Sequence, residues 1–192
     1  MDVWNACGIR DYEVIPEHDG IGLYRVEAHG VEQEMYFLIK KEYSDWNTYL
    51  IQRGKQYKRY TSPSFEIAQI SVCLLFIKYF MFRSQAFRWA ETDELIRTGN
   101  LSEAINRLNN EMGLGENHRI SLREGAEQYH IAIQIENREE ELISCPNAFE
   151  ALRAYRYYSL LLQYLNAVID RMIPEFPQLT NERERLCEMA MR

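Results

Sequence analysis

Apolar and polar positions in the first third of the chain follow the pattern of paired antiparallel strands. The segments 20–27 and 33–40 are rich in branched and aromatic residues and are separated by a turn signal at 28–30. A second pair, 45–52 and 55–60, is joined by Arg53-Gly54, where the glycine can take a positive φ. The pattern therefore predicts two hairpins before the first long helix.

The first long helix is predicted to begin at Ser62-Pro63. A serine side chain can cap free amides, and a proline at the first helical position has no amide to leave unbonded. The segment 65–82 carries apolar residues on nearly every face, so the helix must be covered from several sides. Lys78 and Arg83 interrupt the apolar run, and a bilayer span needs about 20 apolar residues, so we expect a core helix and no membrane crossing.

A connector and a second set of strands and helices follow. Residues 91–112 predict one or two amphipathic helices, with Ser102 as a cap and Gly113 as the stop. The remaining expected elements are extended segments starting at 119, 127 and 139, a long helix over 149–170, and a short terminal helix capped by Thr180 or Asn181.

Two parts of the chain share one plan. Ser62-Pro63 followed by Phe65-Glu66 corresponds to Cys145-Pro146 followed by Phe149-Glu150, each after a hairpin and each before an aromatic-rich helix. Such a recurrence can also arise by accident. If it is real, it predicts an α+β fold of two related units of antiparallel strands, each followed by a long apolar helix and joined by a helical connector. The expected segments, within one compact domain, are 1–90, 91–116 and 117–192.

Composition and charge narrow the classes of function. The 192 residues are 46% hydrophobic and 12% aromatic, which is enough to build a core. A formal net charge of -7 argues against nucleic acid and anionic membranes as partners. The N-terminus has no basic stretch followed by an apolar run, so we expect a cytoplasmic protein. The four cysteines, including Cys73 in the core helix, are far apart and are expected to be reduced thiols.

The usual motifs of catalysis and cofactor binding are missing from the sequence. It contains no G-x-G-x-x-G, G-x-x-x-x-G-K-[ST], H-E-x-x-H or G-x-S-x-G. We therefore expect no cofactor, no metal and no catalytic residue. Of the dispersed histidines, His130 shares a strand face with Gln128, Ala132 and Gln134, which favours an exposed or hydrogen-bonded sheet histidine over a catalytic base.

A basic cluster in this acidic chain allows two interpretations. Its members are Arg53, Lys55, Lys58 and Arg59. They either bind an anion or protect an edge strand from aggregation, and the charge on both strand faces favours the edge strand. The equivalent place in the second unit holds 139–141, three glutamates, which indicates exposed surface in both units.

The expected partner-binding residues lie in two segments. Tyr43, Asp45, Trp46 and Tyr49 surround a predicted turn, and aromatic residues beside charges are typical of protein interfaces. The alternative for Trp46 is that it begins a strand and packs inward. The other two expected residues, Glu139 and Glu140, are most simply solvated hairpin charges.

The stretch from Ile21 to Tyr79, with MYFLIKK, YLIQRGKQYKRYTS and the helix FEIAQISVCLLFIKYF, resembles bacterial immunity proteins that neutralise secreted toxins. The resemblance is to the group that contains the immunity factor of the tuberculosis necrotizing toxin. It implies an α+β cytoplasmic protein that plugs the active site of an NAD-degrading toxin through a protruding loop. It identifies no individual inhibitory residue.

Three functions follow as hypotheses. The first is an immunity-type inhibitor that binds a cognate toxin. The second is a secretion chaperone or adaptor for an effector protein, which is expected to dimerise through the apolar helices. The third, less favoured, is an enzyme acting on a small polar substrate, with a perturbed carboxylate or histidine in a pocket. The sequence leaves open whether the protein is a monomer or a homodimer.

Overall fold

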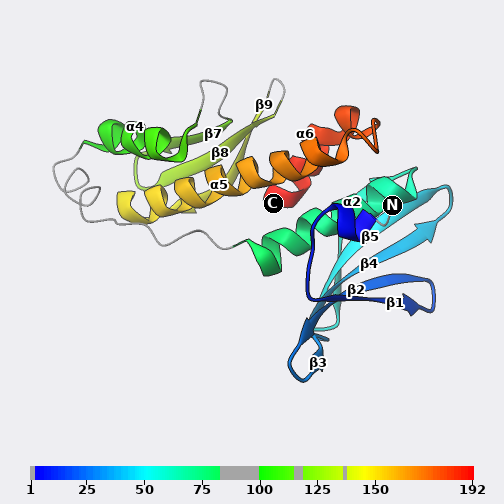
Figure 1. The fold of residues 1–192 in the computed structure, drawn as a ribbon. Helices are drawn as coiled ribbons and strands as arrows, with labels where there is room; N and C mark the ends of the chain where they lie inside the picture. The colour runs from blue at the N-terminus through cyan, green and yellow to red at the C-terminus, as the bar shows by residue number, and fades with distance from the viewer. Residues whose placement is uncertain (1–2, 83–99, 115–118, 136–137) are drawn as a thin grey trace. The chain divides into compact units, whose positions relative to one another are not determined.

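The computed structural model describes residues 3–82, 100–114, 119–135 and 138–192 (Figure 1). The chain divides into two compact units. Unit 1 comprises Met1–Phe82 and Leu165–Ala190, and unit 2 comprises Arg83–Tyr164 and Met191–Arg192. The structure thus groups the last two helical segments with the N-terminal strands, whereas the expected segments placed them with 117–192.

Unit 1 is built on an antiparallel sheet with the strand order β1-β2-β4-β5-β6, and the short β3 also pairs with β2. The predicted strands 20–27 and 45–52 coincide with β2 and β5, and the basic cluster lies on or next to β6, an edge strand, as predicted. Its strands are β1 (Tyr12–Glu17), β2 (Gly20–Glu27), β3 (Gly30–Val31), β4 (Met35–Glu42), β5 (Asp45–Gln52) and β6 (Lys55–Ser62).

Two elements at the N-terminus were not predicted. A short helix, α1 (Val3–Ala6), is followed by β1, which pairs with β2 from Tyr12↔Arg25 to Glu17↔Gly20. β1 reads YEVIPE and none of its residues is buried. A strand that contributes so little to a core has almost no hydrophobic alternation, and its proline is tolerated because β1 lies at the sheet edge.

The first long helix is α2 (Phe65–Phe76), which continues into one π-helical turn, η1 (Ile77–Met81). Nine of the 12 residues of α2 are buried, so the prediction of a helix covered from several sides is confirmed. Phe37 of the sheet packs against this segment, with ring centroids 6.3 Å from Phe76 and 6.0 Å from Phe80. Cys73 lies in this core, and no disulfide joins it to the other three buried cysteines.

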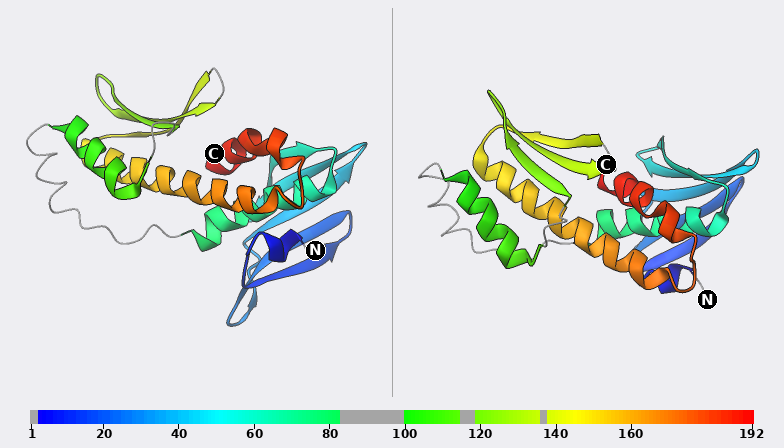
Figure 2. Two further views of the ribbon diagram at one scale, coloured as in Figure 1. Left: turned by 45° about the horizontal axis from the view of Figure 1, so that its top comes forward. Right: turned by 90° about the horizontal axis from the view of Figure 1, so that it is seen from above.

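Two C-terminal segments complete unit 1. They are the end of α5 (Ala148–Met172), over residues 165–172, and α6 (Leu179–Met191) as far as Ala190 (Figure 2). The Tyr60 hydroxyl of β6 donates to Glu182 of α6 at 2.5 Å, and Arg171 of α5 donates to the Cys7 carbonyl at 3.3 Å. These bonds attach both helices to the N-terminal part of the unit.

Unit 2 has a three-stranded antiparallel sheet, in the order β7-β8-β9, together with α4 (Leu101–Met112) and the first part of α5. Its strands are β7 (Ile120–Glu124), β8 (Tyr129–Ile135) and β9 (Arg138–Cys145). Helix α4 lies against α5, because Tyr155 donates to Asn109 at 2.7 Å and Gln163 donates to the Met112 carbonyl at 3.2 Å. The buried Ile131 contributes to the core.

The structure confirms the α+β class, with two sets of antiparallel strands that each lead into a long helix. No helix in the described ranges is both long enough and apolar enough to cross a membrane. The part of the predicted connector at 91–99 and the loop at 115–118 lie outside the described residues.

The helix starts differ from prediction in a regular way. Ser64, and not Ser62, caps α2 by accepting from the Ile67 amide at 3.2 Å, so Pro63 precedes the cap instead of opening the helix. Asn147, after Pro146, caps α5 in the same way. Both prolines thus set the chain direction just before a cap, a role that their fixed φ also suits.

The starts of the other two helices were predicted too late, whereas the start of α2 was predicted too early. Asn100 caps α4 in place of Ser102. Helix α6 begins at Leu179, so Thr180 and Asn181 lie inside it. The predicted stop at Gly113 is confirmed, with φ +63 in the left-handed region that glycine adopts without strain.

The corrected cap of α2 can be tested by stability measurements. Ser64→Ala removes the oxygen that accepts from the Ile67 amide, and we expect it to lower the free energy of unfolding by about 1 kcal/mol. Ser64→Thr keeps a hydroxyl at this position and is expected to stay within a few tenths of a kcal/mol of the wild type. Urea unfolding of the three proteins makes the comparison. Equal stability of Ser64→Ala and the wild type would contradict this cap.

Candidate interaction surfaces

The β4–β5 turn presents the first expected contact residue. Tyr43 is fully exposed, at 102%, and has a positive φ of +58°. It is the first of two turn residues between Glu42 and Asp45, which pair across the hairpin. Asp45 opens β5 and is half-buried. The turn thus holds an aromatic side chain out in solvent, next to two carboxylates.

Trp46 and Tyr49 lie on opposite faces of the sheet. The Trp46 ring packs against Phe65 of α2, with centroids 4.5 Å apart, and the Lys41 Nζ lies 5.5 Å from its centroid. Trp46 therefore packs inward, as the alternative interpretation had it. Tyr49, three residues further along β5, points away from α2 because side chains alternate along a strand. The four expected residues of this segment therefore do not form one surface.

Tyr49 belongs to a second, smaller apolar cluster on the sheet face opposite α2. It is 7% exposed and packs with Leu38, Ile51 and the half-buried Tyr36. Its hydroxyl donates to Glu42 at 2.6 Å. Burial, followed by this hydrogen bond, raises the pKa of Tyr49 to about 12. The phenol is therefore a neutral donor at all physiological pH values.

Tyr24 lies on the same sheet face as Tyr49, and its hydroxyl also donates to a glutamate. The Tyr24 ring stacks on Tyr36 with centroids 4.3 Å apart, and its hydroxyl donates to Glu17. Burial, then this bond, raises the pKa of Tyr24 well above its usual range. Gly22 leaves the space for this ring, because a Cβ there would lie 2.4 Å from a Tyr24 ring carbon. On this face, Tyr24 and Tyr36 stack on each other, and carboxylates accept from the hydroxyl groups of Tyr24 and Tyr49.

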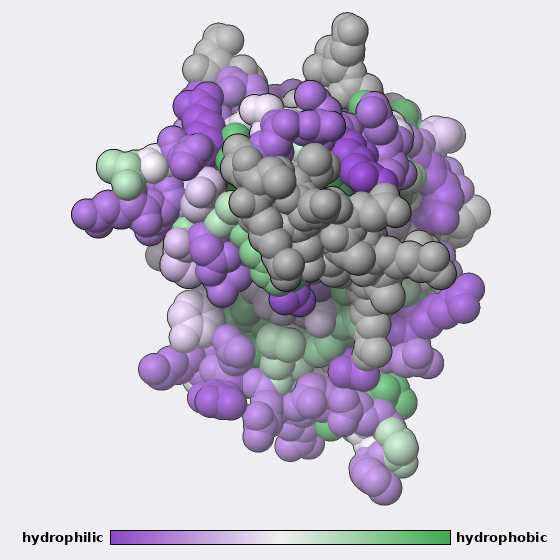
Figure 3. All heavy atoms as spheres, turned by 90° about the vertical axis from the view of Figure 1, so that its left-hand side faces the viewer, coloured by the Kyte–Doolittle hydropathy of each residue, from purple (hydrophilic) through white to green (hydrophobic). Residues whose placement is uncertain are grey.

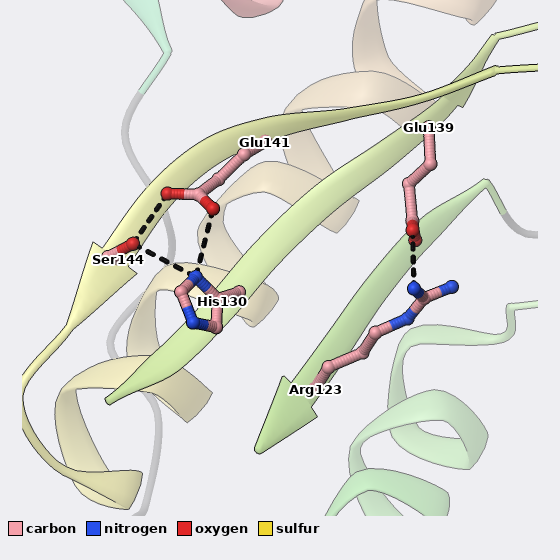
Figure 4. A network of polar contacts seen from close by, with 5 residues as sticks. All are labelled: Arg123, His130, Glu139, Glu141 and Ser144. Atoms are coloured by element: carbon pink, nitrogen blue, oxygen red, sulfur yellow. Dashed lines mark hydrogen bonds and ion pairs between the residues drawn. The ribbon is translucent and has the colours of Figure 1, made fainter. Parts of the chain in front are cut away.

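The outer face of the unit 2 sheet carries a polar network (Figure 4). His130 of β8 lies beside Glu141 and Ser144 of β9. The His130 Nδ1 is 2.9 Å from the Glu141 Oε2 and 3.1 Å from the Ser144 Oγ, and the Ser144 hydroxyl donates to the Glu141 Oε1 at 2.5 Å. The prediction of a hydrogen-bonded sheet histidine is confirmed.

This trio does not have the geometry of a catalytic triad. In a triad the two ring nitrogens of histidine contact different partners, one the nucleophile and the other the carboxylate. Here the serine and the carboxylate both approach Nδ1 of His130 and also bond to each other. The hydrogen bonds from Ser144 and then His130 lower the pKa of the Glu141 carboxyl. The arrangement stabilises a carboxylate on a sheet surface.

The two glutamates expected to bind a partner are both engaged within unit 2. Glu139 accepts from Ser121 at 2.7 Å and pairs with Arg123 at 2.6 Å (Figure 4). Glu140 pairs with Arg138 at 2.7 Å and with Arg192. They lie at successive positions of β9 and so project to opposite faces of the sheet. Any partner that contacts them meets ion pairs and not lone carboxylates.

Sequence reasoning missed the partners of His130. Strand alternation alone placed His130 on a polar face, but the residues of β7 and β9 that face it depend on strand register. The register of β8 and β9 shifts between Ile131 and Ala132, so a count from the turn does not predict which β9 residue lies beside His130. The available signal was polar alternation along β7 and β8.

Polar residues dominate the face of the molecule drawn in Figure 3, where hydrophilic residues surround smaller areas of hydrophobic ones. Within the described part of the chain, no three of His, Cys, Asp and Glu come together in a group that could hold a metal ion. Comparisons with protein-family models, with curated proteins and with solved structures find no match to this chain. Evidence on function therefore comes from the geometry of the two units.

The Glu141 network is expected to make stability depend on acid pH. A carboxyl whose pKa is lower in the folded than in the unfolded state adds stability above its unfolded pKa, and this stability is lost as the pH falls. Urea unfolding at several pH values from 6 to 3 should therefore show a smaller loss of stability for Glu141→Gln than for the wild type. Glu127→Gln, an exposed control before β8, should behave as the wild type does. Identical pH profiles for all three proteins would contradict the role of this network.

Proposed function

We propose that the protein is an immunity-type inhibitor, which binds and neutralises a cognate bacterial toxin through a protein–protein interface centred on the β4–β5 turn. The observation that supports this proposal is Tyr43, a fully exposed aromatic residue at a left-handed backbone position. The resemblance of Ile21 to Tyr79 to immunity proteins that act through a protruding loop points in the same direction.

Stability of the fold does not explain Tyr43. A non-glycine residue in the left-handed region costs about 1–2 kcal/mol, and asparagine or glycine reduces that cost. The exposed ring gains no packing energy in return. A residue that costs stability and contacts nothing within its own unit is a candidate for contact with another molecule. Tyrosine is also among the residues that contribute most to binding at protein interfaces.

The support beneath the turn is well suited to such a contact. Glu42, the residue before Tyr43, accepts from Tyr49 at 2.6 Å and from Asn47 at 2.8 Å. Asn47 in turn accepts from Thr61 of the next strand at 2.7 Å. The turn is therefore fixed to a network that spans β4, β5 and β6. A preorganised contact loses little conformational entropy on binding, which favours affinity.

The second hypothesis, a secretion chaperone, finds less support in the fold. It was expected to dimerise through the apolar helices, but the buried residues of α2, one of these helices, are at most 2% exposed in the structure. They have no apolar surface left to offer a second copy. Light scattering discriminates between the hypotheses, because a chaperone of this kind is a dimer when it is alone in solution.

The direct experiment uses the product of a neighbouring toxin gene. We expect the purified protein to bind that toxin in a one-to-one complex by isothermal titration calorimetry, and its co-expression to restore growth of cells that produce the toxin. An absence of binding to every neighbouring product, with no rescue of growth, would refute the proposed function.

Tyr43 provides a sharper prediction. Tyr43→Asn is expected to raise the free energy of unfolding by about 1 kcal/mol, because asparagine tolerates the left-handed region. The same variant is expected to bind the toxin at least about tenfold more weakly, a loss of about 1.4 kcal/mol. Tyr57→Asn, at an exposed position of β6, is the matched control and should bind as tightly as the wild type does. If Tyr43→Asn binds the toxin as tightly as the wild type does, Tyr43 is not part of the interface.

A further inference from the structure

One member of the basic cluster differs from the other three. Arg53, Lys55 and Lys58 are exposed, whereas Arg59 is half-buried. Arg59 is also the extra residue of a β-bulge, because Tyr49 pairs with Lys58 while the preceding residue, Thr48, pairs with Tyr60. A bulge bends the strand and redirects a side chain, and bulges are frequent next to functional sites. Protection of the edge strand from aggregation explains the charges of Arg53, Lys55 and Lys58, which are exposed. It does not explain Arg59, which is half-buried.

The guanidinium of Arg59 has two buried donors without an acceptor. Its Nε and Nη2 atoms are inaccessible to solvent and make no hydrogen bond. Buried charged groups are nearly always paired, and a buried donor without an acceptor destabilises the fold, more so when it is charged. An unsatisfied group of this kind in a folded protein calls for an explanation, such as a bound ion.

These two donors are the pair that suits an oxyanion. Nε and Nη2 lie on the same edge of the planar guanidinium, and their N–H bonds run side by side. This fork matches the two oxygens of a carboxylate or of a phosphate group. The unpaired atoms of Arg59 therefore form one complete bidentate binding edge, and not two unrelated defects.

A second cation lies near Arg59. Lys78 is half-buried in the π-helical turn η1, where the Phe82 amide donates to the Ile77 carbonyl at 2.7 Å. Burial, then the positive charge of Arg59, lowers the pKa of Lys78 to about 8. π-Helical turns are rare and are frequent at functional sites. Each of the two cations thus lies at a backbone irregularity of unit 1, Arg59 in a strand and Lys78 in a helix.

We propose that Arg59 and Lys78 form a binding site for an oxyanion, in which the Nε–Nη2 edge of Arg59 holds two oxygens and Lys78 adds a further positive charge. The group bound is a carboxylate or a phosphate. Its charge offsets the repulsion between the two cations, and its oxygens satisfy the buried donors of Arg59. This site is independent of the proposed contact at Tyr43, so either proposal can fail alone.

Thermal unfolding with simple anions tests the site. The melting temperature is measured at pH 7 in sodium chloride, sodium phosphate and sodium acetate of equal ionic strength. Wild-type protein is expected to melt at least about 2 °C higher in phosphate or in acetate than in chloride, which corresponds to about 1 kcal/mol for a chain of this size. A larger shift in acetate identifies a carboxylate site, and a larger shift in phosphate identifies a phosphate site.

Two variants separate specific binding from general salt effects, since phosphate also stabilises proteins by exclusion from their surface. Arg59→Gln is expected to lose the rise in melting temperature that the wild type shows in phosphate or acetate relative to chloride. Lys58→Gln, a substitution at the exposed neighbouring position, is expected to keep this rise. Arg59→Gln should also melt higher than the wild type in chloride, because it removes an unpaired buried charge. If Arg59→Gln does not fold, Lys78→Gln is measured in its place. Its rise in melting temperature in phosphate or acetate is expected to be smaller than that of the wild type. Equal shifts in the wild type and in the folded variant would overturn the proposal.

Discussion

Enclosure of helix α2 is the constraint on which the rest of unit 1 depends. A helix with buried residues on nearly every face is stable in water only if other elements surround it. The sheet supplies one wall through Phe37, and α1, the end of α5 and α6 belong to the same unit. The chain therefore returns at its C-terminus to the strands with which it began, and hydrogen bonds such as that from Tyr60 to Glu182 hold it there.

Because the core is closed in this way, turns and sheet faces are the parts of the protein that can contact another molecule. In both units several polar groups on the sheet faces are paired with one another. Tyrosine hydroxyls bind glutamates in unit 1, and Glu141 receives hydrogen bonds in unit 2. Paired surface groups hold their positions before any partner arrives, which lowers the entropic cost of binding. Such faces suit recognition of another molecule.

The sequence was sufficient to predict most strands and both long helices, because alternation and turn residues are local signals. β5 and its turn at Arg53-Gly54 are an example, with φ of +49° and +73° as a two-residue hairpin turn of this type requires. Alternation along β5 also implied that Trp46 and Tyr49 lie on opposite faces. The caps of α2 and α4 were each misplaced by two residues, because more than one serine or asparagine competed for each start. The partners of His130 and the burial of Arg59 depend on bulges, which are set by tertiary packing and leave no local pattern.

Tyr43 and Arg59 share a property that links the two proposals. Each occupies a position where a different residue would make the fold more stable, since asparagine suits the left-handed turn and an uncharged residue suits the buried bulge. Other positions of the chain suit their local conformation, such as the cap at Ser64 and the left-handed Gly113. A residue that lowers the stability of the fold, with no compensating contact inside it, is expected where that residue binds another molecule. A fully exposed phenol ring and an unsatisfied guanidinium edge differ in chemistry, so they indicate two separate contacts and not one extended site.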